Sequence, residues 1–522
     1  MAQTRLFTNK NILIILGVIF VCIAIPRIIF PDLDHGDEFA DADVLNAAAN
    51  FVTFGFIKTH FLPFFSPQFD TPEGPYTHYP PLTQIFYGIV SILFRTDSLY
   101  FFRIIALFFT FLNLIFWYFF IRKITGSPGL GFLCAIFYLT NPFFIYGADA
   151  LNHASYSDFL RSFILYVFLI MLGAPRNRKT LLLWLLWILN VIGSLVSFEY
   201  IIFLSLFFIL FRYFFKAAKS SLSWKAIFVL LTAPVFGFLL HFLQNAWYFG
   251  SFQLAFQDFK NIAIQRIVNS ADAPVMTFYA WWNYVIVRNF SLIFLFNYLL
   301  LFMLSFYSYL LYHRLSPESK KELNPLLRLF ILLAVCGVSW YIAFPSHSWA
   351  HAFVGFLVRH LVPVASVGFT IFCFIIIRYI KENLSFRRYA NIFLILIIVT
   401  IAITGIRNSQ LPVTPGKIKG AQEFIKFKEC LLKLNEISQQ KDEVAVNYFR
   451  FPFIRYYTNR HCVAIFNKPS LERLSVYPRY FIFLPYNNQD AQVLYEYLKD
   501  RYTPLWQCNS LSFPAVFFEL KK

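Results

Sequence analysis

An acidic segment between two apolar stretches contains the side chains best suited to accept a proton. Residues 31–43 read PDLDHGDEFADAD and hold six of the 27 Asp and Glu residues in a chain of 522 residues with a formal net charge of +18. Asp37 and Glu38 are adjacent there, and Asp34 lies close by. A carboxylate in this position can act as a general base toward a hydroxyl group. The alternative is a solvated acidic loop.

A second group of candidate side chains lies in residues 346–363, SHSWAHAFVGFLVRHLVP. His347 and His351 are four residues apart and share one face if the segment is helical. Arg359 and His360 begin the next apolar stretch, where an arginine can bind a phosphate through two parallel hydrogen bonds. Extension of the arginine toward lipid headgroups is the alternative. Two histidine nitrogens alone do not make a metal site, so no cofactor is expected, with a divalent metal as the alternative.

Polar side chains also occur where short connections join apolar stretches. EGPYTHYPPL (73–82) precedes an apolar helix, GADALNHASYSD (147–158) is a tight connection, and SFEY (197–200) is a helix hairpin. An acid at the border of a membrane is costly and often functional. An interfacial tyrosine belt, a helix cap at Asp158 and a hairpin turn in water are the respective alternatives. The candidate substrate-binding residues are His78, Tyr79, Asp149, His153, Asp158 and Glu199.

The composition indicates which elements must position these residues. The chain is 58% hydrophobic and 14% charged, whereas soluble domains have about 25% charged residues. Apolar stretches of membrane-spanning length recur, and a chain in lipid satisfies its own backbone hydrogen bonds by forming helices. We therefore predict an α-helical polytopic membrane protein with about eleven transmembrane helices. They are expected at 11–30, 99–121, 129–146, 159–173, 180–197, 199–216, 225–243, 288–312, 326–344, 359–379 and 389–406.

Lys and Arg residues are distributed unevenly over the connections between these helices. Basic connections at 122–129, 174–179, 216–225, 313–328 and 378–388 alternate with connections that contain few Lys or Arg residues. By the positive-inside rule, the N-terminus and the basic connections are cytoplasmic and the acidic loop is outside. We predict an integral protein of the cytoplasmic (inner) membrane. Topology explains the basic charge, so a nucleic-acid partner is not expected.

Two outer-face helices and a C-terminal domain complete the predicted architecture. The first outer loop, 31–98, contains helix-like stretches at 39–55 and 79–97 that we predict to lie in the membrane interface. After residue 406 the composition becomes charged, and VAVNYF, YFIFLPY and AVFFEL have the composition of short strands. We therefore predict a transmembrane domain at 1–406 and a small extracytoplasmic α/β domain at 407–522.

Three of the seven cysteines, Cys430, Cys462 and Cys508, lie in this C-terminal segment. A disulfide between two of them is compatible with a location outside the cytoplasm. The other four lie in apolar stretches and are expected to be packing residues.

The candidate motifs occur in an order that resembles a known enzyme family. The acidic pair at 37–38 is followed by AAANFVTFG (47–55) and YPPL (79–82), and later by NPFFIYGADALNHASYSD (141–158) and RHLVP (359–363). With a cytoplasmic N-terminus and many spans, this set resembles the polyprenyl-phosphate-dependent GT-C glycosyltransferases across the transmembrane region. The most similar branch is the one that contains protein-mannosyltransferase-like and aminoarabinose-transferase-like enzymes.

The resemblance implies an enzyme that transfers a sugar, with inversion, from a polyprenyl-phosphate-linked donor. It implies a general base at the first acid of the loop motif, which is Asp37 here, with Glu38 beside it. Asp34 is a rival for this role. The base and the phosphate-binding group would lie on opposite sides of the sugar, near the outer membrane surface.

The resemblance also implies that the late arginine, Arg359, binds the donor phosphate. His360, His347 and His351 belong to the same predicted phosphate-binding group. The family often has Arg-Tyr where this chain has Arg359-His360, which is a departure from its pattern.

Two other functions compete with glycosyl transfer. A transporter or flippase of a lipid-linked glycan would have ionisable residues near the middle of the bilayer and often repeated halves. Here the polar clusters lie at helix ends and no repeat is visible, which favours the enzyme over this alternative. A structural membrane protein would leave the acidic loop and the arginine unexplained. The acceptor is expected to be a lipid, a glycan or a protein.

Overall fold

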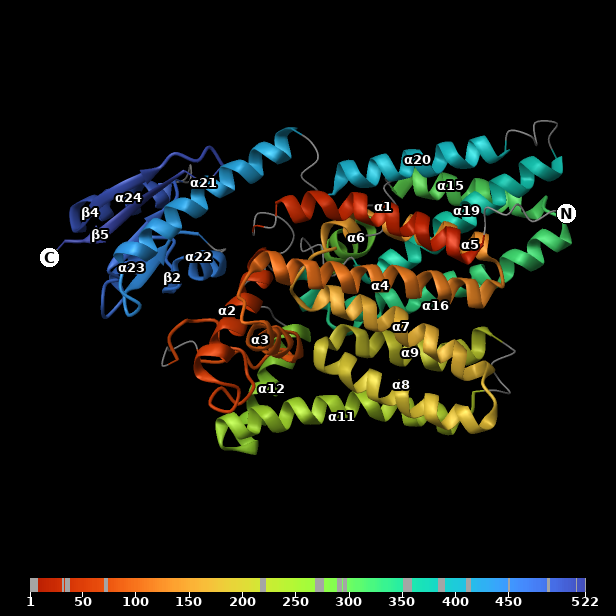
Figure 1. Ribbon diagram of the computed structural model, residues 1–522, viewed down its shortest axis with the longest axis horizontal. Helices are drawn as coiled ribbons and strands as arrows, with labels where there is room; N and C mark the ends of the chain where they lie inside the picture. The colour runs from red at the N-terminus through yellow and green to blue at the C-terminus, as the bar shows by residue number, and fades with distance from the viewer. Residues whose placement is uncertain are drawn as a thin grey trace.

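The structure is a computed structural model in which long helices run side by side and a small mixed domain lies at one end (Figure 1). It describes residues 8–30, 32, 38–69, 74–215, 222–267, 277–288, 293, 298–350, 359–383, 390–409, 415–448, 451–485, 489–512 and 514–521.

Seven helices are long and apolar enough to cross a membrane among the residues that the structure describes. They are α1 (Asn9–Ile29), α4 (Leu99–Thr125), α7 (His153–Gly173), α8 (Arg176–Val196), α11 (Trp224–Phe249), α16 (Pro317–Ala343) and α19 (Val362–Asn383), the last preceded by the 3-10 turn η3 (Arg359–Leu361). Shorter apolar helices lie between them: α5 (Pro128–Leu139), α6 (Pro142–Tyr146), α9 (Phe198–Phe214), α15 (Tyr298–His313) and α20 (Ala390–Asn408).

Ten of the eleven predicted spans overlap these helices over most of their length. The predicted span at 288–312 matches α15 only from Tyr298 onward, because most of residues 289–297 lie outside the described part of the chain.

The predicted span at 129–146 is divided into α5 and α6. The division has a local cause. Asn141 has extended backbone, and its side chain accepts a hydrogen bond from the N–H of Phe143, while Pro142 occupies the first helical position. An N-cap asparagine followed by proline starts a new helix.

The hairpin between α4 and α5 shows how the sequence ends one helix and starts the next. Gly126 adopts φ +70°, a left-handed conformation that suits glycine and closes α4. Ser127 then caps α5 by accepting the N–H of Leu130, and Pro128 takes the first helical position. These three residues reverse the chain within one tight turn.

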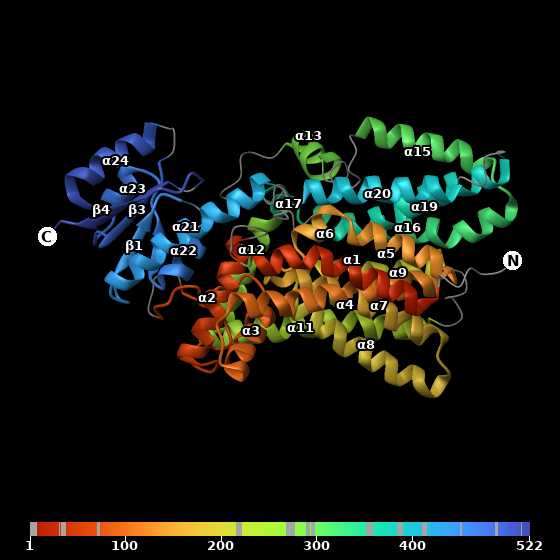
Figure 2. The same cartoon turned by 45° about the horizontal axis from the view of Figure 1, so that its top comes forward.

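The short helices gather at one end of the helical body, which we call the α2 end. They are α2 (Glu38–Phe54), α3 (Leu82–Phe94), α12 (Phe252–Ile267), α13 (Phe278–Trp281), the π-helix η2 (Trp282–Val287) and α17 (Pro345–Ala350). Both views place α2, α3 and α12 beside the C-terminal domain and far from the N-terminus (Figures 1 and 2). The helix-like stretches predicted at 39–55 and 79–97 are therefore confirmed as helices α2 and α3.

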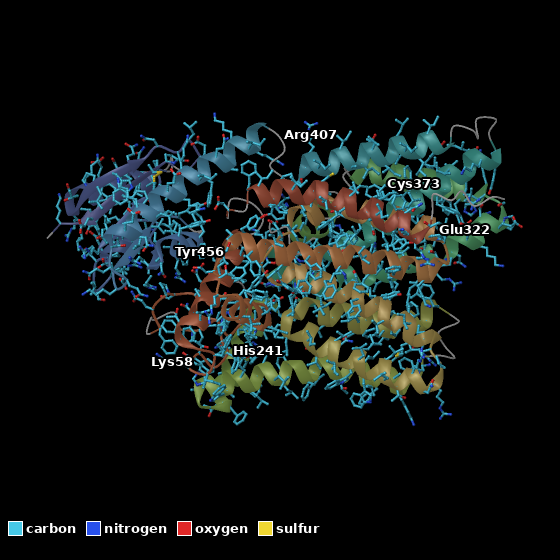
Figure 3. The ribbon with its side chains drawn as sticks, viewed as in Figure 1. Lys58, His241, Glu322, Cys373, Arg407 and Tyr456 are labelled. Carbon is cyan, nitrogen blue, oxygen red and sulfur yellow. A yellow bond between two sulfur atoms is a disulfide. The ribbon has the colours of Figure 1, made fainter. Side chains whose placement is uncertain are left out.

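Helix ends with basic residues lie at the opposite end of the body. The last turn of α4 contains Arg122 and Lys123, and α8 begins at Arg176. Glu322 and Cys373 lie toward this end, whereas Lys58 and His241 lie toward the α2 end and Tyr456 lies in the C-terminal domain (Figure 3). The basic helix ends thus lie at the end of the body opposite the acidic first loop, as the charge pattern predicts. The orientation in the membrane stays a prediction.

The C-terminal domain is a five-stranded mixed sheet with helices. Its order is β2-β1-β3-β5-β4, with β1 parallel to β2 and β3, and β5 antiparallel to β3 and β4. The strands are β1 (Glu443–Val446), β2 (His461–Ala464), β3 (Tyr480–Phe483), β4 (Tyr502–Cys508) and β5 (Ala515–Leu520). The helices are α21 (Pro415–Ile437), α22 (Phe451–Thr458), α23 (Lys468–Glu472) and α24 (Gln489–Arg501).

A disulfide joins Cys430 of α21 to Cys508 of β4, with 6.1 Å between their Cα atoms. Cys462 is buried in β2 and takes no part in this bond. The sequence left open whether two of these three cysteines pair, and the structure shows the pair to be Cys430 and Cys508.

The C-terminal domain is bonded to the first loop of the membrane body. The Lys428 ammonium lies 2.6 Å from a carboxylate oxygen of Asp32, and Tyr457 donates to the same oxygen at 3.3 Å. Ser66 Oγ lies 3.0 Å from His461 Nδ1. These contacts hold the domain against the segment that contains the acidic motif.

Candidate functional site

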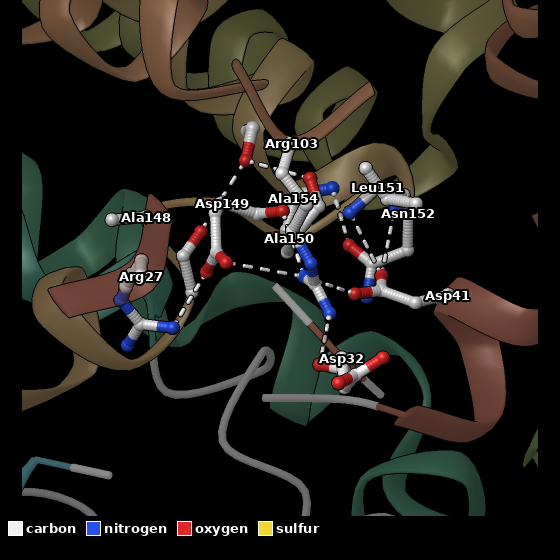
Figure 4. A network of polar contacts seen from close by, with 12 residues as sticks. Arg27, Asp32, Asp41, Arg103, Ala148, Asp149, Ala150, Leu151, Asn152 and Ala154 are labelled. Carbon is white, nitrogen blue, oxygen red and sulfur yellow. Dashed lines mark hydrogen bonds and ion pairs between the residues drawn. The ribbon is translucent and has the colours of Figure 1, made fainter. Parts of the chain in front are cut away.

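Two buried clusters of charged side chains lie toward the α2 end. The first, which we call the four-charge network, consists of Arg27 on α1, Asp41 on α2, Arg103 on α4 and Asp149 after α6 (Figure 4). All four side chains are at most 1% exposed. Two cations and two anions therefore offset one another away from water.

The carboxylate oxygens of the four-charge network all have donors. Arg27 lies 2.6 Å from Asp149 Oδ1, and Arg103 lies 3.4 Å from Asp149 Oδ2. Asp41 Oδ2 accepts from Arg103 at 2.9 Å, while its Oδ1 accepts the backbone N–H groups of residues 151–152 at 2.8 and 3.0 Å. Asp149, a candidate substrate-binding residue from the sequence, is thus part of a closed network that joins α1, α2 and α4.

The second cluster, the Asp158 cluster, joins α7, α9 and η3. Arg359 donates from Nε to Asp158 Oδ2 at 2.9 Å and from Nη1 to the carbonyl of Gly147 at 2.7 Å. Arg161 lies 3.0 Å from Asp158 Oδ1, and the Tyr200 hydroxyl donates to the same oxygen. A side chain at position 147 would collide with the Arg359 guanidinium, so the glycine permits this contact.

Glu199 extends the Asp158 cluster toward the first loop. It lies in the first turn of α9, is 2% exposed, and accepts hydrogen bonds on Oε2 from Tyr79 and Ser197. His153 Nε2 lies 3.8 Å from the same oxygen, and the His153 side chain is 20% exposed. Burial, and then the nearby Glu199 carboxylate, raise the pKa of Tyr79 well above its usual value, so its hydroxyl stays protonated and donates. Glu199 Oε1 is buried and has no hydrogen-bond partner among the described residues.

An apolar cavity of about 220 Å³ lies between α9, α11, α12 and α16, beside Glu199. We call it the Arg266 cavity, because Arg266 and His78 are the polar side chains of its lining. Arg266 donates to the His78 carbonyl at 2.9 Å, and its guanidinium lies 5.5 Å from the centre of the Tyr79 ring. Burial lowers the pKa of His78, and Arg266 lowers it further. Tyr79 thus connects Arg266 of the cavity lining with Glu199 of the Asp158 cluster.

The structure brings most of the described candidates into one region. Among the candidates, His78 lines the Arg266 cavity. Tyr79 bonds to Glu199 and contacts the ring of His153, which lies 3.8 Å from the same carboxylate oxygen. Three further candidates lie in the Asp158 cluster: Asp158, Arg359 and His360. The His360 ring lies 4.8 Å from that of Tyr200.

His347 lies next to the wall of the Arg266 cavity. It accepts a hydrogen bond on Nδ1 at 3.3 Å from the indole of Trp340, which lines the cavity. Asp34, Asp37 and His351 lie outside the described residues, as does the side chain of Glu38, the first residue of α2. Their roles stay predictions.

Sequence reasoning missed four arginines that are central to these clusters. Arg27, Arg103 and Arg161 lie inside apolar helices, and an ionisable residue in such a helix is itself a signal of function or pairing. Arg266 gives a weaker signal, because it lies in a polar connection among other charged residues. In the part of the chain that the structure describes, no group of three or more His, Cys, Asp and Glu side chains could hold a metal ion.

Comparison with protein-family models and with curated proteins returns no match for this chain. Solved structures do match. ArnT from Cupriavidus metallidurans bound to undecaprenyl phosphate aligns over 96% of this chain and 97% of its own, with a TM-score of 0.57 and 11% identity. This chain has the GT-C fold. The apo structure of the same ArnT aligns over 96% of this chain and 97% of its own, with a TM-score of 0.54 and 10% identity.

A GT-C protein of another kind matches over most of this chain as well. The oligosaccharyltransferase of Archaeoglobus fulgidus, solved with zinc and sulfate, aligns over 91% of this chain and 68% of its own, with a TM-score of 0.52 and 15% identity. The fold class predicted from the sequence, a GT-C-like helical membrane protein with a small C-terminal α/β domain, is confirmed. At this level of identity the likeness concerns the fold.

Proposed function

We propose that the protein is a membrane glycosyltransferase that transfers a sugar from a polyprenyl-phosphate-linked donor to an acceptor, with inversion. The observation that carries the proposal is the Arg266 cavity, in which an apolar lining ends at a guanidinium group. A polyprenyl phosphate has the same division into a hydrocarbon chain and an anionic head. The ArnT structure with bound undecaprenyl phosphate supports a ligand of this class.

The donor would lie with its isoprenoid chain along Phe198, Ile262 and Trp340 and with its phosphate at Arg266. An arginine is suited to this task because its planar fork matches phosphate oxygens. A guanidinium has five N–H groups, and the bond to the His78 carbonyl occupies one of them.

Sugar transfer requires an acceptor oxygen or nitrogen to attack the anomeric carbon from the side opposite the phosphate. The new bond forms as the bond to the phosphate oxygen breaks, and its electron pair leaves with the phosphate. The acceptor proton passes to a base. We propose Asp37 for this role, with Glu38 beside it and Asp34 as the rival.

We propose that Glu199 and His153 act on the phosphate side of the sugar. Glu199 would orient the His153 ring, one N–H of which would then bond to the departing phosphate. Arg359 and His360 were predicted to bind the phosphate themselves. The bonds from Arg359 to Asp158 and Gly147 favour a role in which Arg359 also positions the helix that carries His153.

We propose that the reaction takes place at the extracytoplasmic face of the inner membrane. Basic helix ends at the opposite end of the body and a disulfide in the C-terminal domain support this orientation. No cofactor is proposed. A divalent metal stays the alternative, because the acidic loop supplies carboxylates and the oligosaccharyltransferase neighbour was solved with zinc.

Reconstituted protein given radiolabelled polyprenyl-phosphate sugars and acceptor membranes tests the proposal. Wild-type protein should transfer label, and Asp37→Asn should abolish transfer while Asp34→Asn retains it. Arg378→Ala is the matched control, because Arg378 pairs with Glu322 far from the site. Absence of transfer with every donor, or full activity of Asp37→Asn, would contradict the respective part of the proposal.

A further inference from the structure

A second apolar groove lies on the other side of α11 from the Arg266 cavity. It has a volume of about 370 Å³ and lies between α3, α8, α11 and the turn at residues 60–61. We call it the His60 groove. The two spaces share no lining residue, and the segment from His78 to Pro81 separates them.

The turn at the end of the groove has an unusual backbone. His60 and Phe61 have φ values of 55° and 59°, although neither is glycine. Left-handed conformations at two successive residues with side chains are disfavoured and occur mainly at functional sites. Gln244 of α11 stabilises this turn by donating to the carbonyls of His60 and Phe61 at 3.2 and 2.7 Å. Trp247 meets the His60 ring edge-on at 4.6 Å.

This turn brings a polar atom to an apolar groove. His60 lines the groove, and its Nδ1 is buried without a hydrogen-bond partner among the described residues. A buried polar atom without a partner is costly, and a bound ligand or water molecule with a suitable polar group would satisfy it. Gln244 is the other polar side chain of the lining, and no charged acid or base lines it.

The groove lies beside exposed apolar side chains of α11. Leu243 and Trp247 are each 49% exposed on α11, which is one of the helices long and apolar enough to span a bilayer. Lys58, two residues before His60, does not line the groove, and its ammonium lies 4.6 Å from the centre of the Phe69 ring.

We propose that the His60 groove binds one phospholipid, with an acyl chain in the groove and a phosphate oxygen accepting a hydrogen bond from His60 Nδ1. An uncharged lining suits a lipid chain, and the unpartnered His60 nitrogen suits a phosphate oxygen. The sugar donor is not the occupant, because Arg266 and Glu199 lie on the other side of the 78–81 segment. The site is thus separate from the proposed reaction.

The chain supplies a matched control. A groove between α1 and α4 has a similar volume, about 360 Å³, and is lined by apolar residues such as Ala24, Ile104 and Phe108. None of its lining side chains carries a nitrogen or oxygen atom. Because it has no polar group to bind a lipid head, labelling in this groove measures the background from the lipids that surround the protein.

Photo-crosslinking tests the proposal without any enzyme assay. A benzophenone amino acid replaces Leu243 in one protein and Ile104 in another, and both are reconstituted in vesicles of phosphatidylcholine and phosphatidylglycerol with added polyprenyl phosphate. Mass spectrometry then identifies the adducts. We expect phospholipid adducts at position 243 to exceed those at 104 by roughly fivefold, the factor that one net hydrogen bond supplies.

Two second-site changes refine the test. His60→Phe removes the hydrogen bond, and Ile85→Trp fills the groove from α3, so either should reduce labelling at 243 to the level at 104. A thermal melt identifies any variant that fails to fold, and Ile85→Trp leaves the strained turn intact. Equal labelling at both positions in the parent proteins, or polyprenyl phosphate as the main adduct at 243, would overturn the proposal.

Discussion

The two buried clusters have the same charges and differ in how completely those charges are bonded. The four-charge network contains two arginines and two aspartates, and each carboxylate oxygen has a donor. The Asp158 cluster contains two arginines, Asp158 and Glu199, but leaves Glu199 Oε1 and two nitrogens of Arg161 buried without partners among the described residues. The second cluster also borders a cavity and includes the partly exposed His153.

This difference separates a structural role from a functional one. In the four-charge network every carboxylate oxygen is paired, although Arg27 Nε is buried without a partner among the described residues. Such pairing of buried carboxylates fixes the relative positions of the elements that the network joins. A cluster with unused bonding capacity is costly unless a ligand or substrate completes it. We therefore propose that the four-charge network holds α1, α2 and α4 together and that the Asp158 cluster binds substrate.

The largest expected effect comes from opening the four-charge network. Arg103→Met leaves Asp41 and Asp149 buried with one cation between them, and loss of one partner of a buried pair costs about 3–5 kcal/mol. The variant should melt far below wild type in detergent. Arg378→Met, which removes a half-exposed pair with Glu322, should change stability by less than about 1 kcal/mol. Similar melting of both variants would show that the network is not structural.

A smaller effect is expected at the edge of the Asp158 cluster. Arg266→Ala removes a charge-assisted bond to the proposed donor phosphate, worth about 1.5–3 kcal/mol. The KM for the polyprenyl-phosphate donor should therefore rise by roughly tenfold to a hundredfold, with little change in melting temperature. Arg266→Lys should recover part of the loss because it keeps the charge. An unchanged donor KM in Arg266→Ala would exclude the cavity as the donor site.

The smallest expected effect is a pH dependence at His78. Burial lowers its folded pKa below the usual value of about 6.5, so the unfolded chain binds a proton first as the pH falls. Stability from this group is present above pH about 6.5 and decreases below it. His78→Gln should flatten the melting temperature between pH about 7 and 5.5, whereas His313→Gln, exposed at the other end, should not. Parallel curves for all three proteins would contradict this assignment.

Much of the fold could be predicted because hydropathy and helix caps are local properties of the sequence. Apolar length located the spans, and the strands at β1, β3 and β5 matched their apolar segments. β2 (His461–Ala464) is as short as β1 and β3, and it was missed because it begins with the polar His461 directly after Arg460. β4 was missed because it contains Pro504 next to a register shift against β5, and proline disfavours a strand assignment.

The candidate site was predictable only in part, because its contacts join distant segments. The sequence indicated several site residues one at a time, as polar residues at the ends of apolar stretches: Tyr79, His153, Asp158 and Glu199. Their pairing could not be predicted, since the Tyr79–Glu199 bond spans 120 residues of sequence. Nothing in the sequence distinguished Asp149, which lies in the closed network, from Asp158, because both lie in one short polar connection.

One matched experiment tests the difference between the clusters most directly. Asp149→Asn and Glu199→Gln each convert one buried carboxylate to an amide, and both proteins are assayed for melting temperature and for sugar transfer per folded molecule. We expect Asp149→Asn to lower the free energy of unfolding by about 3 kcal/mol or more, while the molecules that fold still transfer sugar. We expect Glu199→Gln to melt near the wild-type temperature and to transfer sugar at least about a hundredfold more slowly. The reverse pattern, or equal effects of the two substitutions on both quantities, would contradict this difference between the clusters.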